Sequence, residues 1–117
     1  MEILGRRQQA VLVREKSQEK ILLNKPIFRI GRKQQLVDCF IGDNPTVSRI
    51  HAHIEIRGNS YVITDCNSVN HTYVNGEHLP AGKAHVLRHG DVSLTVMYSI
   101  KNPFFQFGGS KLHALLF

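Results

Sequence analysis

The chain has 117 residues, of which 42% are hydrophobic, and this composition fits one globular domain and excludes a disordered chain. Lys and Arg outnumber Asp and Glu by 15 to 9, and the formal charge of +6 favours an anionic partner without choosing among nucleic acid, acidic lipid and phosphorylated protein. No apolar run approaches the ~20 residues that cross a bilayer, and residues 1–7 lack a secretory signal, so we expect an intracellular protein of the cytoplasm or nucleus.

Short strand-like runs alternate with turn residues along the chain, and no long segment keeps a helical period. In chain order, the runs that we predict to form strands are residues 10–14, 21–23, 27–30, 38–41, 51–57, 60–64, 72–74, 84–87, 92–100 and 104–107. In the clearest run, 51–57, Ala52, Ile54 and Ile56 face one way and the polar residues face the other. Many short strands with turns between them predict an antiparallel sandwich or barrel.

Turn signals and an apolar tail delimit the runs. Residues 42–45 (GDNP) predict a strong turn, and the pairs Gly58-Asn59 and Asn75-Gly76 predict tight hairpins. The chain ends in an apolar tail, residues 111–117, so we place the domain at residues 1–110. The sequence leaves open whether this tail packs on the domain, begins a following segment or contacts a partner, and whether the protein forms a dimer.

The cysteines and histidines predict neither a disulfide nor a metal site. Cys39 and Cys66 are too few for a disulfide scaffold, and we expect both to be small buried side chains. His51 and His53 lie on one face of a strand, a geometry that zinc can use, but no third or fourth ligand follows at a recognisable spacing. We therefore expect no metal.

Three clusters of small polar residues stand at the ends of strand-like runs, and we expect them to converge at one edge of a β fold. They are residues 30–32 (IGR), 47–51 (VSRIH) and 65–76 (DCNSVNHTYVNG). A phosphate monoester needs a charged donor, preferably a guanidinium, together with hydroxyl, amide and backbone N–H donors. The side chains that offer these groups are Arg32, Ser48, Arg49 and Asn70. Taken singly each has an ordinary surface explanation, and only their combination is specific.

In combination these residues resemble the forkhead-associated (FHA) domain, a family of phosphothreonine-peptide readers. The matching pattern is Gly-Arg, then Ser-x-x-His, then Asp-x-x-Ser-x-Asn-x-Thr-x-x-Asn-Gly, and the motif core covers residues 28–91. The resemblance implies an all-β antiparallel sandwich of about eleven short strands, with the binding loops at one edge. It also implies a binding module that has no catalytic activity and needs no cofactor.

The resemblance assigns roles to residues by matching position. Arg32 and Ser48 would bind the phosphate directly, and Arg49 would add a second cation at its edge. Asn70 would hydrogen-bond the ligand backbone beside the phosphothreonine. The other positions expected to meet the peptide, including its third residue after the phosphothreonine, are Thr46, Val69 and His71.

Four further positions resemble scaffold residues of the family. Gly31 lets the chain turn, His51 braces the Ser48 loop, and Asn75 fixes a neighbouring loop beside the positive φ of Gly76. The sequence departs from the family pattern at three places. Asn67 and His71 stand where glycine is common, and Val69 replaces a frequent hydroxyl residue.

Other functions fit the residues less well. Ser48 and His51 could form a nucleophile–base pair with Asp43 or Asp65, but no Gly-x-Ser-x-Gly elbow surrounds the serine, so we predict no enzyme. Nucleic-acid binding is the strongest alternative because of the +6 charge, but aromatic residues make up only 8% and no basic strand is interleaved with them. A degenerate FHA scaffold that binds proteins without phosphate is a further alternative. The expected partner is a phosphothreonine-containing protein or peptide, with no membrane.

Overall fold

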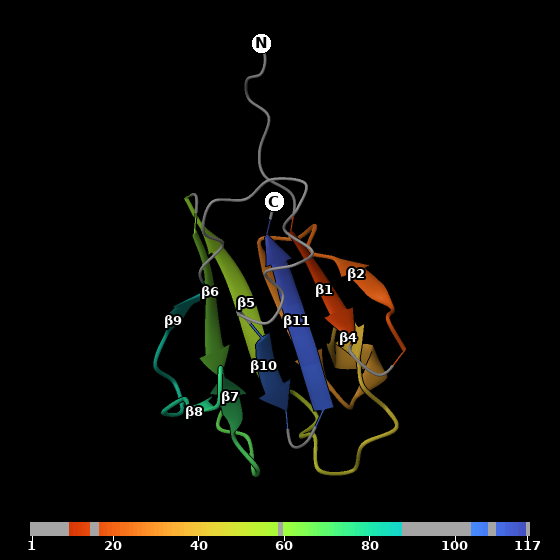
Figure 1. The fold of residues 1–117 in the computed structure, drawn as a ribbon. Coiled ribbons are helices and arrows are strands. Elements are labelled where there is room, and N and C mark those ends of the chain that lie inside the picture. Colours follow the sequence, from red (N-terminus) through yellow and green to blue (C-terminus); the bar gives the residue numbers. More distant parts are fainter. Residues whose placement is uncertain (1–9, 15–16, 59, 88–103, 108–109, 117) are drawn as a thin grey trace.

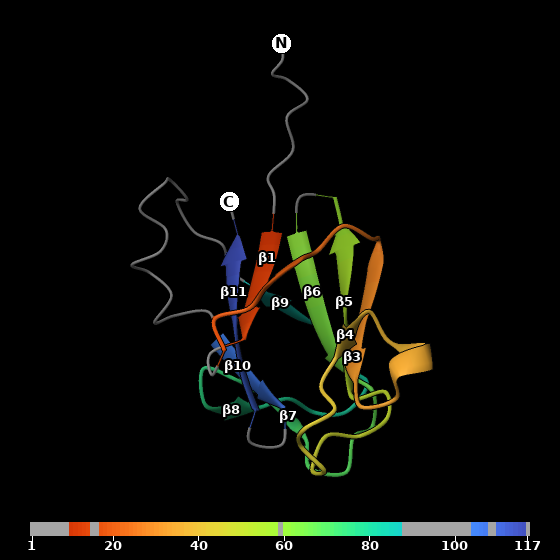
Figure 2. The same ribbon diagram turned by 90° about the vertical axis from the view of Figure 1, so that its right-hand side faces the viewer.

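The computed structural model describes residues 10–14, 17–58, 60–87, 104–107 and 110–116, which fold into two facing β-sheets (Figures 1 and 2). Within these residues one six-stranded sheet has the order β2-β1-β11-β10-β7-β8, and one five-stranded sheet has the order β4-β3-β5-β6-β9. The strands are β1 (Ala10–Arg14), β2 (Lys20–Leu22), β3 (Ile27–Gly31), β4 (Cys39–Phe40), β5 (Ala52–Arg57), β6 (Ser60–Asp65), β7 (Thr72–Val74), β8 (Glu77–His78), β9 (His85–Leu87), β10 (Phe104–Phe107) and β11 (Ser110–Leu116). The predicted all-β sandwich is confirmed.

The five-stranded sheet is built on the alternation that its sequence predicts. β5 and β6 pair antiparallel along their whole length, from Ala52 opposite Asp65 to Arg57 opposite Ser60. Ala52 and Ile54 are buried, whereas Arg57 is exposed. β3 pairs antiparallel with β5 and parallel with the short β4. Because the buried faces of β3, β5 and β6 coincide, the register of this sheet is fixed by its hydrophobic pattern.

The core lies between the two sheets and continues under the loops. Large side chains with less than 2% exposure come from both sheets and from the β4–β5 loop. They are Leu12, Ile30, Ile41, Val47, Ile54, Ile63, Leu87 and Leu112, together with the polar His51. Cys39 is also buried, and burial raises the pKa of its thiol to about 11. Cys66 is only half-buried, contrary to prediction, because it follows the end of β6.

The apolar tail is part of the six-stranded sheet. β11 pairs antiparallel with β1 on one side and with β10 on the other, so it lies inside the sheet and not at its edge. The boundary that the sequence placed after residue 110 cuts this strand, and the tail therefore packs on the domain. The sequence did not predict β11, because a short apolar end segment carries no periodicity that distinguishes a strand from a docking tail.

Several smaller elements differ from the prediction or lie outside the described residues. The two-residue strand β8 and the short 3₁₀ turn η1 (Gln34–Leu36) are too brief to give a sequence signal. The predicted strand 92–100, the end of the motif core at residues 88–91, and Asn59 of the predicted hairpin lie outside the described part of the chain. In the described residues, no helix has the length and hydrophobicity needed to span a bilayer.

The core packing predicts a strong effect for a single truncation in β5. Ile54 is 1% exposed, so Ile54→Ala should lower the free energy of unfolding by about 2–5 kcal/mol through lost burial and a residual cavity. Val86, in the same sheet, is 55% exposed, and Val86→Ala should change it by less than about 0.5 kcal/mol. Urea unfolding of both variants checks this, and equal effects would contradict the placement of the core.

Candidate functional site

The β4–β5 loop and the β6–β7 loop meet at one end of the sandwich, the lower end in Figures 1 and 2. The end of β3 lies directly against the first of these loops. The backbone N–H of Arg32 donates to the carbonyl oxygens of Ser48 at 3.0 Å and Arg49 at 3.1 Å, and that of Lys33 donates to Arg49 at 3.2 Å. The three polar clusters of the sequence therefore converge.

Gly31 permits the close approach of these two segments. A Cβ placed on Gly31 would lie 2.1 Å from the carbonyl oxygen of Arg49, well inside any real contact. That same oxygen accepts the hydrogen bonds from Arg32 and Lys33. Glycine is required here because a side chain has no space. The φ of Gly31 is not positive, so its backbone conformation alone does not require glycine.

His51 joins the two long loops from inside the protein. Its ring is fully buried; Nδ1 accepts a hydrogen bond of 2.9 Å from the Ser48 backbone N–H, and Nε2 lies 2.8 Å from the His71 carbonyl oxygen. These two partners require the neutral ring with its proton on Nε2. Burial lowers the pKa of His51 below its ordinary value of 6.5, although the His71 carbonyl and the charge of Asp65 act in the opposite direction. His51 is therefore neutral at physiological pH.

Asp65 holds the start of the β6–β7 loop. Its carboxylate is buried and accepts hydrogen bonds from the Ser68 backbone N–H at 3.1 Å, the Ser68 hydroxyl at 2.5 Å and the Thr72 hydroxyl at 2.6 Å. Burial alone would raise the pKa of Asp65, but these hydrogen bonds outweigh it and leave the pKa below 3.8. The spacing Asp-x-x-Ser-x-x-x-Thr was visible in the sequence, yet its structural role was not recognised there.

Two hydrogen bonds connect the facing loops at the surface. The Val69 backbone N–H donates to the Ser48 hydroxyl oxygen at 3.0 Å, and the Asn70 side-chain amide donates to the Thr46 carbonyl oxygen at 2.9 Å. Because the Ser48 oxygen accepts in this contact, the hydroxyl proton can be donated to an anion. The carbonyl oxygen of the Asn70 side chain can likewise accept from a peptide N–H.

The cations of the site lie beside these hydroxyl and amide groups. The Nε of Arg32 donates to the Val47 carbonyl oxygen at 2.8 Å, which orients the guanidinium and leaves its two terminal nitrogens as a fork. Arg49 follows Ser48 and is exposed. The arrangement offers a guanidinium fork and a hydroxyl donor along a short stretch of surface, which is the donor set that a phosphate monoester needs.

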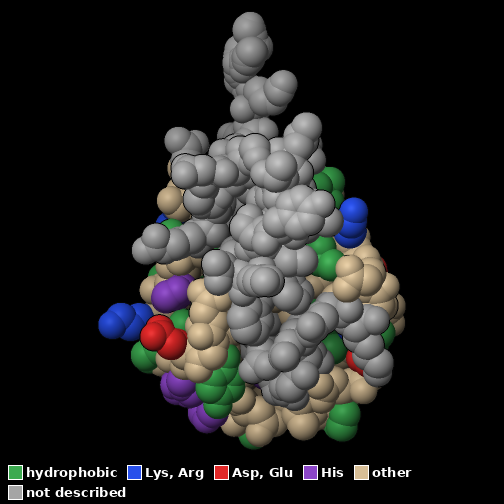
Figure 3. Space-filling model, viewed as in Figure 1, with side chains coloured by type: hydrophobic (Ala, Val, Ile, Leu, Met, Phe, Trp, Pro, Cys, Tyr) green, Lys and Arg blue, Asp and Glu red, His purple; other side chains and the backbone are tan. Residues whose placement is uncertain are grey.

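The β6–β7 loop uses left-handed backbone at two positions where glycine was expected. Asn67 has a φ of 58° and His71 a φ of 68°. The His71 ring packs edge-on against His78, with 4.4 Å between ring centroids, and Figure 3 shows histidine side chains gathered at this corner near β7 and β8. Val69, in the same loop, is 79% exposed, and Thr46 in the β4–β5 loop is exposed as well.

Two of the predicted scaffold residues lie in the turn that follows β7. Asn75 and Gly76, with φ values of 53° and 84°, form the predicted turn between β7 and β8. The role of this turn at the site stays a prediction. His53 contacts the Cys66 sulfur at 3.4 Å, away from the His51 ring contacts. Among the described residues, no group of three or more His, Cys, Asp and Glu side chains could hold a metal ion.

The hydrogen bonds of His51 and Asp65 bear on the alternative in which Ser48 and His51 form a nucleophile–base pair. The His51 nitrogen that faces Ser48 accepts from the Ser48 backbone N–H. The second ring nitrogen faces a carbonyl oxygen, whereas Asp65 is occupied by Ser68 and Thr72. In these contacts His51 and Asp65 hold the loops in place.

Comparison with known sequences and structures gives consistent matches. The family model described as FHA domain matches residues 28–95. The glycogen accumulation regulator GarA of Mycolicibacterium smegmatis is 40% identical over 72 residues, which cover 62% of this chain and 42% of that protein. The chain thus spans less than half the length of this curated relative.

Two solved structures share the architecture. Mycobacterium tuberculosis EmbR in complex with a low-affinity phosphopeptide matches with a TM-score of 0.78 and 25% identity, over 98% of this chain and 26% of that chain. A structure concerned with phosphothreonine-dependent FHA domain interactions matches with a TM-score of 0.72 over 92% of this chain and 95% of that chain. Its identity of 23% supports the fold alone.

The close approach at Gly31 generates a prediction. Gly31→Ala should push the β3 end away from Arg49 and lower the free energy of unfolding by about 1–3 kcal/mol, because the added Cβ meets backbone. NMR amide shifts of Arg32 and Lys33 should move. Gly58→Ala is the control, since nothing lies within 4 Å of its added Cβ and only its φ of 61° is strained. Unchanged amides in Gly31→Ala would disprove the steric argument.

Burial of His51 predicts a dependence of stability on pH. Its folded pKa lies below 6.5, so as the pH falls through about 6.5 the unfolded chain binds the proton first and the free energy of unfolding decreases. Asp65 also has a lowered pKa, but its stabilisation is lost only at more acid pH, from about 3.8 downward. Chemical unfolding between about pH 7.5 and 5 should show the decrease, and His51→Gln should flatten it. The same slope in both proteins would contradict this assignment.

Proposed function

Because this chain belongs to the FHA domain family, whose model matches residues 28–95, we propose that it binds phosphothreonine-containing segments of partner proteins and recruits those proteins in signalling. The observation that carries the proposal is the convergence of an oriented guanidinium, a hydroxyl donor and a side-chain amide on loops from separate strands. In this proposal the module binds and does not catalyse, and it works inside the cell.

The phosphate would lie against Arg32 and Ser48. The terminal nitrogens of Arg32 can donate to two phosphate oxygens at once, and the Ser48 hydroxyl can donate to a third. Arg49, exposed beside Ser48, would add a second positive charge at the edge. A charge-assisted hydrogen bond is about twice as strong as a neutral one, so Arg32 should dominate the affinity.

The peptide backbone would run along the two facing loops. Asn70 already donates to the Thr46 carbonyl, which leaves its side-chain oxygen for a peptide N–H beside the phosphothreonine. Thr46, Val69 and His71 would meet the neighbouring side chains. The small area of such a contact predicts micromolar affinity, about −8 kcal/mol or weaker.

The preference for threonine over serine comes from the family and fits a simple physical argument. Burying the threonine methyl contributes about 0.8 kcal/mol by area, and close packing increases the discrimination. Two relatives support phosphorylated ligands in general: EmbR binds a phosphopeptide in its solved structure, and phosphothreonine-dependent interactions are described for another FHA domain of the same fold.

Substitution of Arg32 tests the proposal. Arg32→Ala should weaken binding to a phosphothreonine peptide about 10- to 100-fold, because a charge-assisted hydrogen bond contributes about 1.5–3 kcal/mol. Arg57→Ala is the matched control: it removes the same charge from the far end of β5, where Arg57 pairs with Glu55 at 2.9 Å. Fluorescence anisotropy with phosphorylated and unphosphorylated peptides measures both.

Two results would contradict the proposal. Equal binding of Arg32→Ala and wild type would refute the site, and equal binding of phosphorylated and unphosphorylated peptides would indicate the phosphate-independent scaffold. A labelled DNA or RNA duplex that binds well while no phosphopeptide does would favour the nucleic-acid alternative that the +6 charge permits.

A further inference from the structure

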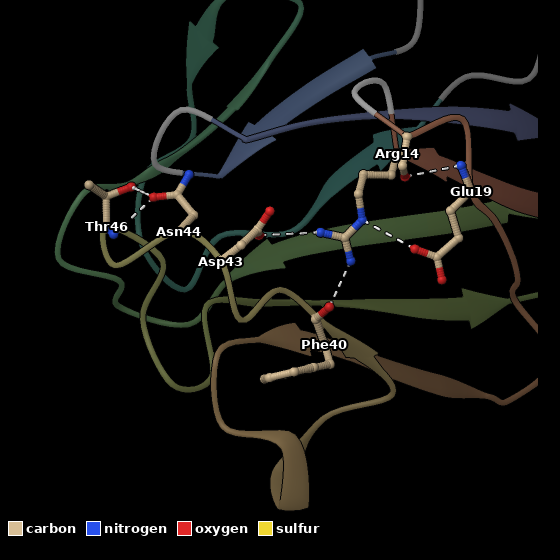
Figure 4. Close-up of polar contacts among 7 residues, drawn as sticks. Arg14, Glu19, Phe40, Asp43, Asn44 and Thr46 are labelled. Atoms are coloured by element: carbon tan, nitrogen blue, oxygen red, sulfur yellow. Dashed lines mark hydrogen bonds and ion pairs between the residues drawn. The ribbon is translucent and has the colours of Figure 1, made fainter.

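Arg14 is a mostly buried arginine outside the predicted binding residues. It lies in β1, in the six-stranded sheet, and its side chain is only 17% exposed. Its terminal nitrogen Nη2 donates to the Phe40 carbonyl oxygen at 2.7 Å. Figure 4 shows the guanidinium between Glu19 on one side and Asp43 on the other. A buried cation needs such partners, because leaving one unpaired is costly.

The two carboxylates bind this guanidinium unequally. Nη1 lies 3.7 Å from Asp43 and Nε lies 3.4 Å from Glu19, where the Nε has no hydrogen bond of good geometry. Both pairs are thus ionic contacts, and the short bond to Phe40 fixes the direction of the fork. A guanidinium can reach three groups in one plane, which an ammonium cannot.

One of these partners, Asp43, belongs to the loop that would face the peptide. Residues 42–46 lie between Ile41 and Val47, both of which are buried. Inside this segment the Asn44 side-chain oxygen accepts from the backbone N–H of Thr46 at 3.0 Å and from its hydroxyl at 2.5 Å (Figure 4). The segment is therefore a compact turn. Arg14 contacts Asp43 near the start of this turn and Phe40 just before it.

The phosphate-binding side chains are held by a different set of contacts. Arg32 and Ser48 are fixed from the five-stranded sheet, by the Gly31 contact and by the His51 ring. Arg14 reaches across from the opposite sheet and touches neither of them. Arg14 therefore contacts the start of residues 42–46, whereas their end is linked through the Thr46 carbonyl oxygen to Asn70.

We propose that Arg14 is a positioning residue that sets the orientation of residues 42–46 and thereby the side-chain preference for peptide residues that follow the phosphothreonine. This inference rests on the proposed function. Arg14 acts through the loop and does not touch the ligand, because its side chain is only 17% exposed and is held by Phe40 and Asp43. Its loss should change selectivity more than it changes the requirement for phosphate.

A peptide panel separates these two effects. The panel holds the phosphothreonine constant, varies each following position among acidic, basic and apolar residues, and includes the unphosphorylated parent. The variants are Arg14→Met, which keeps much of the side-chain length without the charge, Asp43→Asn, the double variant, and Glu19→Gln as the control. Glu19 touches Arg14 from the β1–β2 turn and not from the loop.

The expected result is a loss of preference with phosphate dependence retained. Arg14→Met and Asp43→Asn should each reduce the affinity ratio between the best and worst panel peptides by up to about fivefold, which corresponds to the upper range of a surface ion pair. The double variant should lose no more than Arg14→Met alone, because Arg14→Met already removes the contact that Asp43→Asn removes. Glu19→Gln should keep the wild-type preference, and all variants should keep the wild-type ratio of phosphorylated to unphosphorylated binding.

Other outcomes would overturn the inference. Unchanged preference in Asp43→Asn, whose side chain is 63% exposed and should not impair folding, would refute it even if Arg14→Met unfolds. Additive losses in the double variant would mean that Asp43 meets the peptide directly. If the wild-type protein binds no phosphopeptide at all, the proposed function itself fails. If the variants bind in a phosphate-dependent way with an unaltered preference, only the inference about Arg14 fails.

Discussion

The site depends on one buried imidazole. His51 accepts from the Ser48 backbone and faces the His71 carbonyl, so a single neutral ring fixes the two loops that carry the proposed ligand contacts other than Arg32. Its own backbone N–H donates to Ile30 at the end of β3, which adds the third segment. A hydrogen bond in the fully buried position is insulated from water, so the loops are oriented before a ligand arrives.

Two further constraints refine this arrangement. Gly31 removes the side chain that would separate β3 from the Arg49 backbone, and Asp65 gathers the Ser68 and Thr72 hydroxyls at the base of the second loop. Gly31 and Asp65 both lie in the five-stranded sheet. The turn at residues 42–46 is instead contacted by Arg14 from the other sheet. Contacts from both sheets therefore reach the loops at this end of the sandwich.

Some of this could be predicted from the sequence. The alternation of Ala52, Ile54 and Ile56 predicts β5 because burial enforces a period of two, and the polar clusters at strand ends predict converging loops. The role of Arg14 could not be predicted, because its partner Phe40 is 26 positions away and no local pattern connects them. The place of β11 was missed for a similar reason: strand pairing with β1 spans nearly the whole chain. The left-handed His71 was identified only as a departure from glycine, whereas its φ of 68° shows that the loop keeps its geometry without one.

The central claim is that the three converging segments form one phosphate-dependent binding surface. Its most direct test is an NMR titration of the isotopically labelled chain with a phosphothreonine peptide, followed by the same peptide without phosphate. We predict large amide shifts at Arg32, Ser48 and Val69 that appear only with the phosphorylated peptide, while the exposed face of β5 and β9 stays unchanged. Shifts centred on that outer face, or identical shifts with both peptides, would contradict the claim.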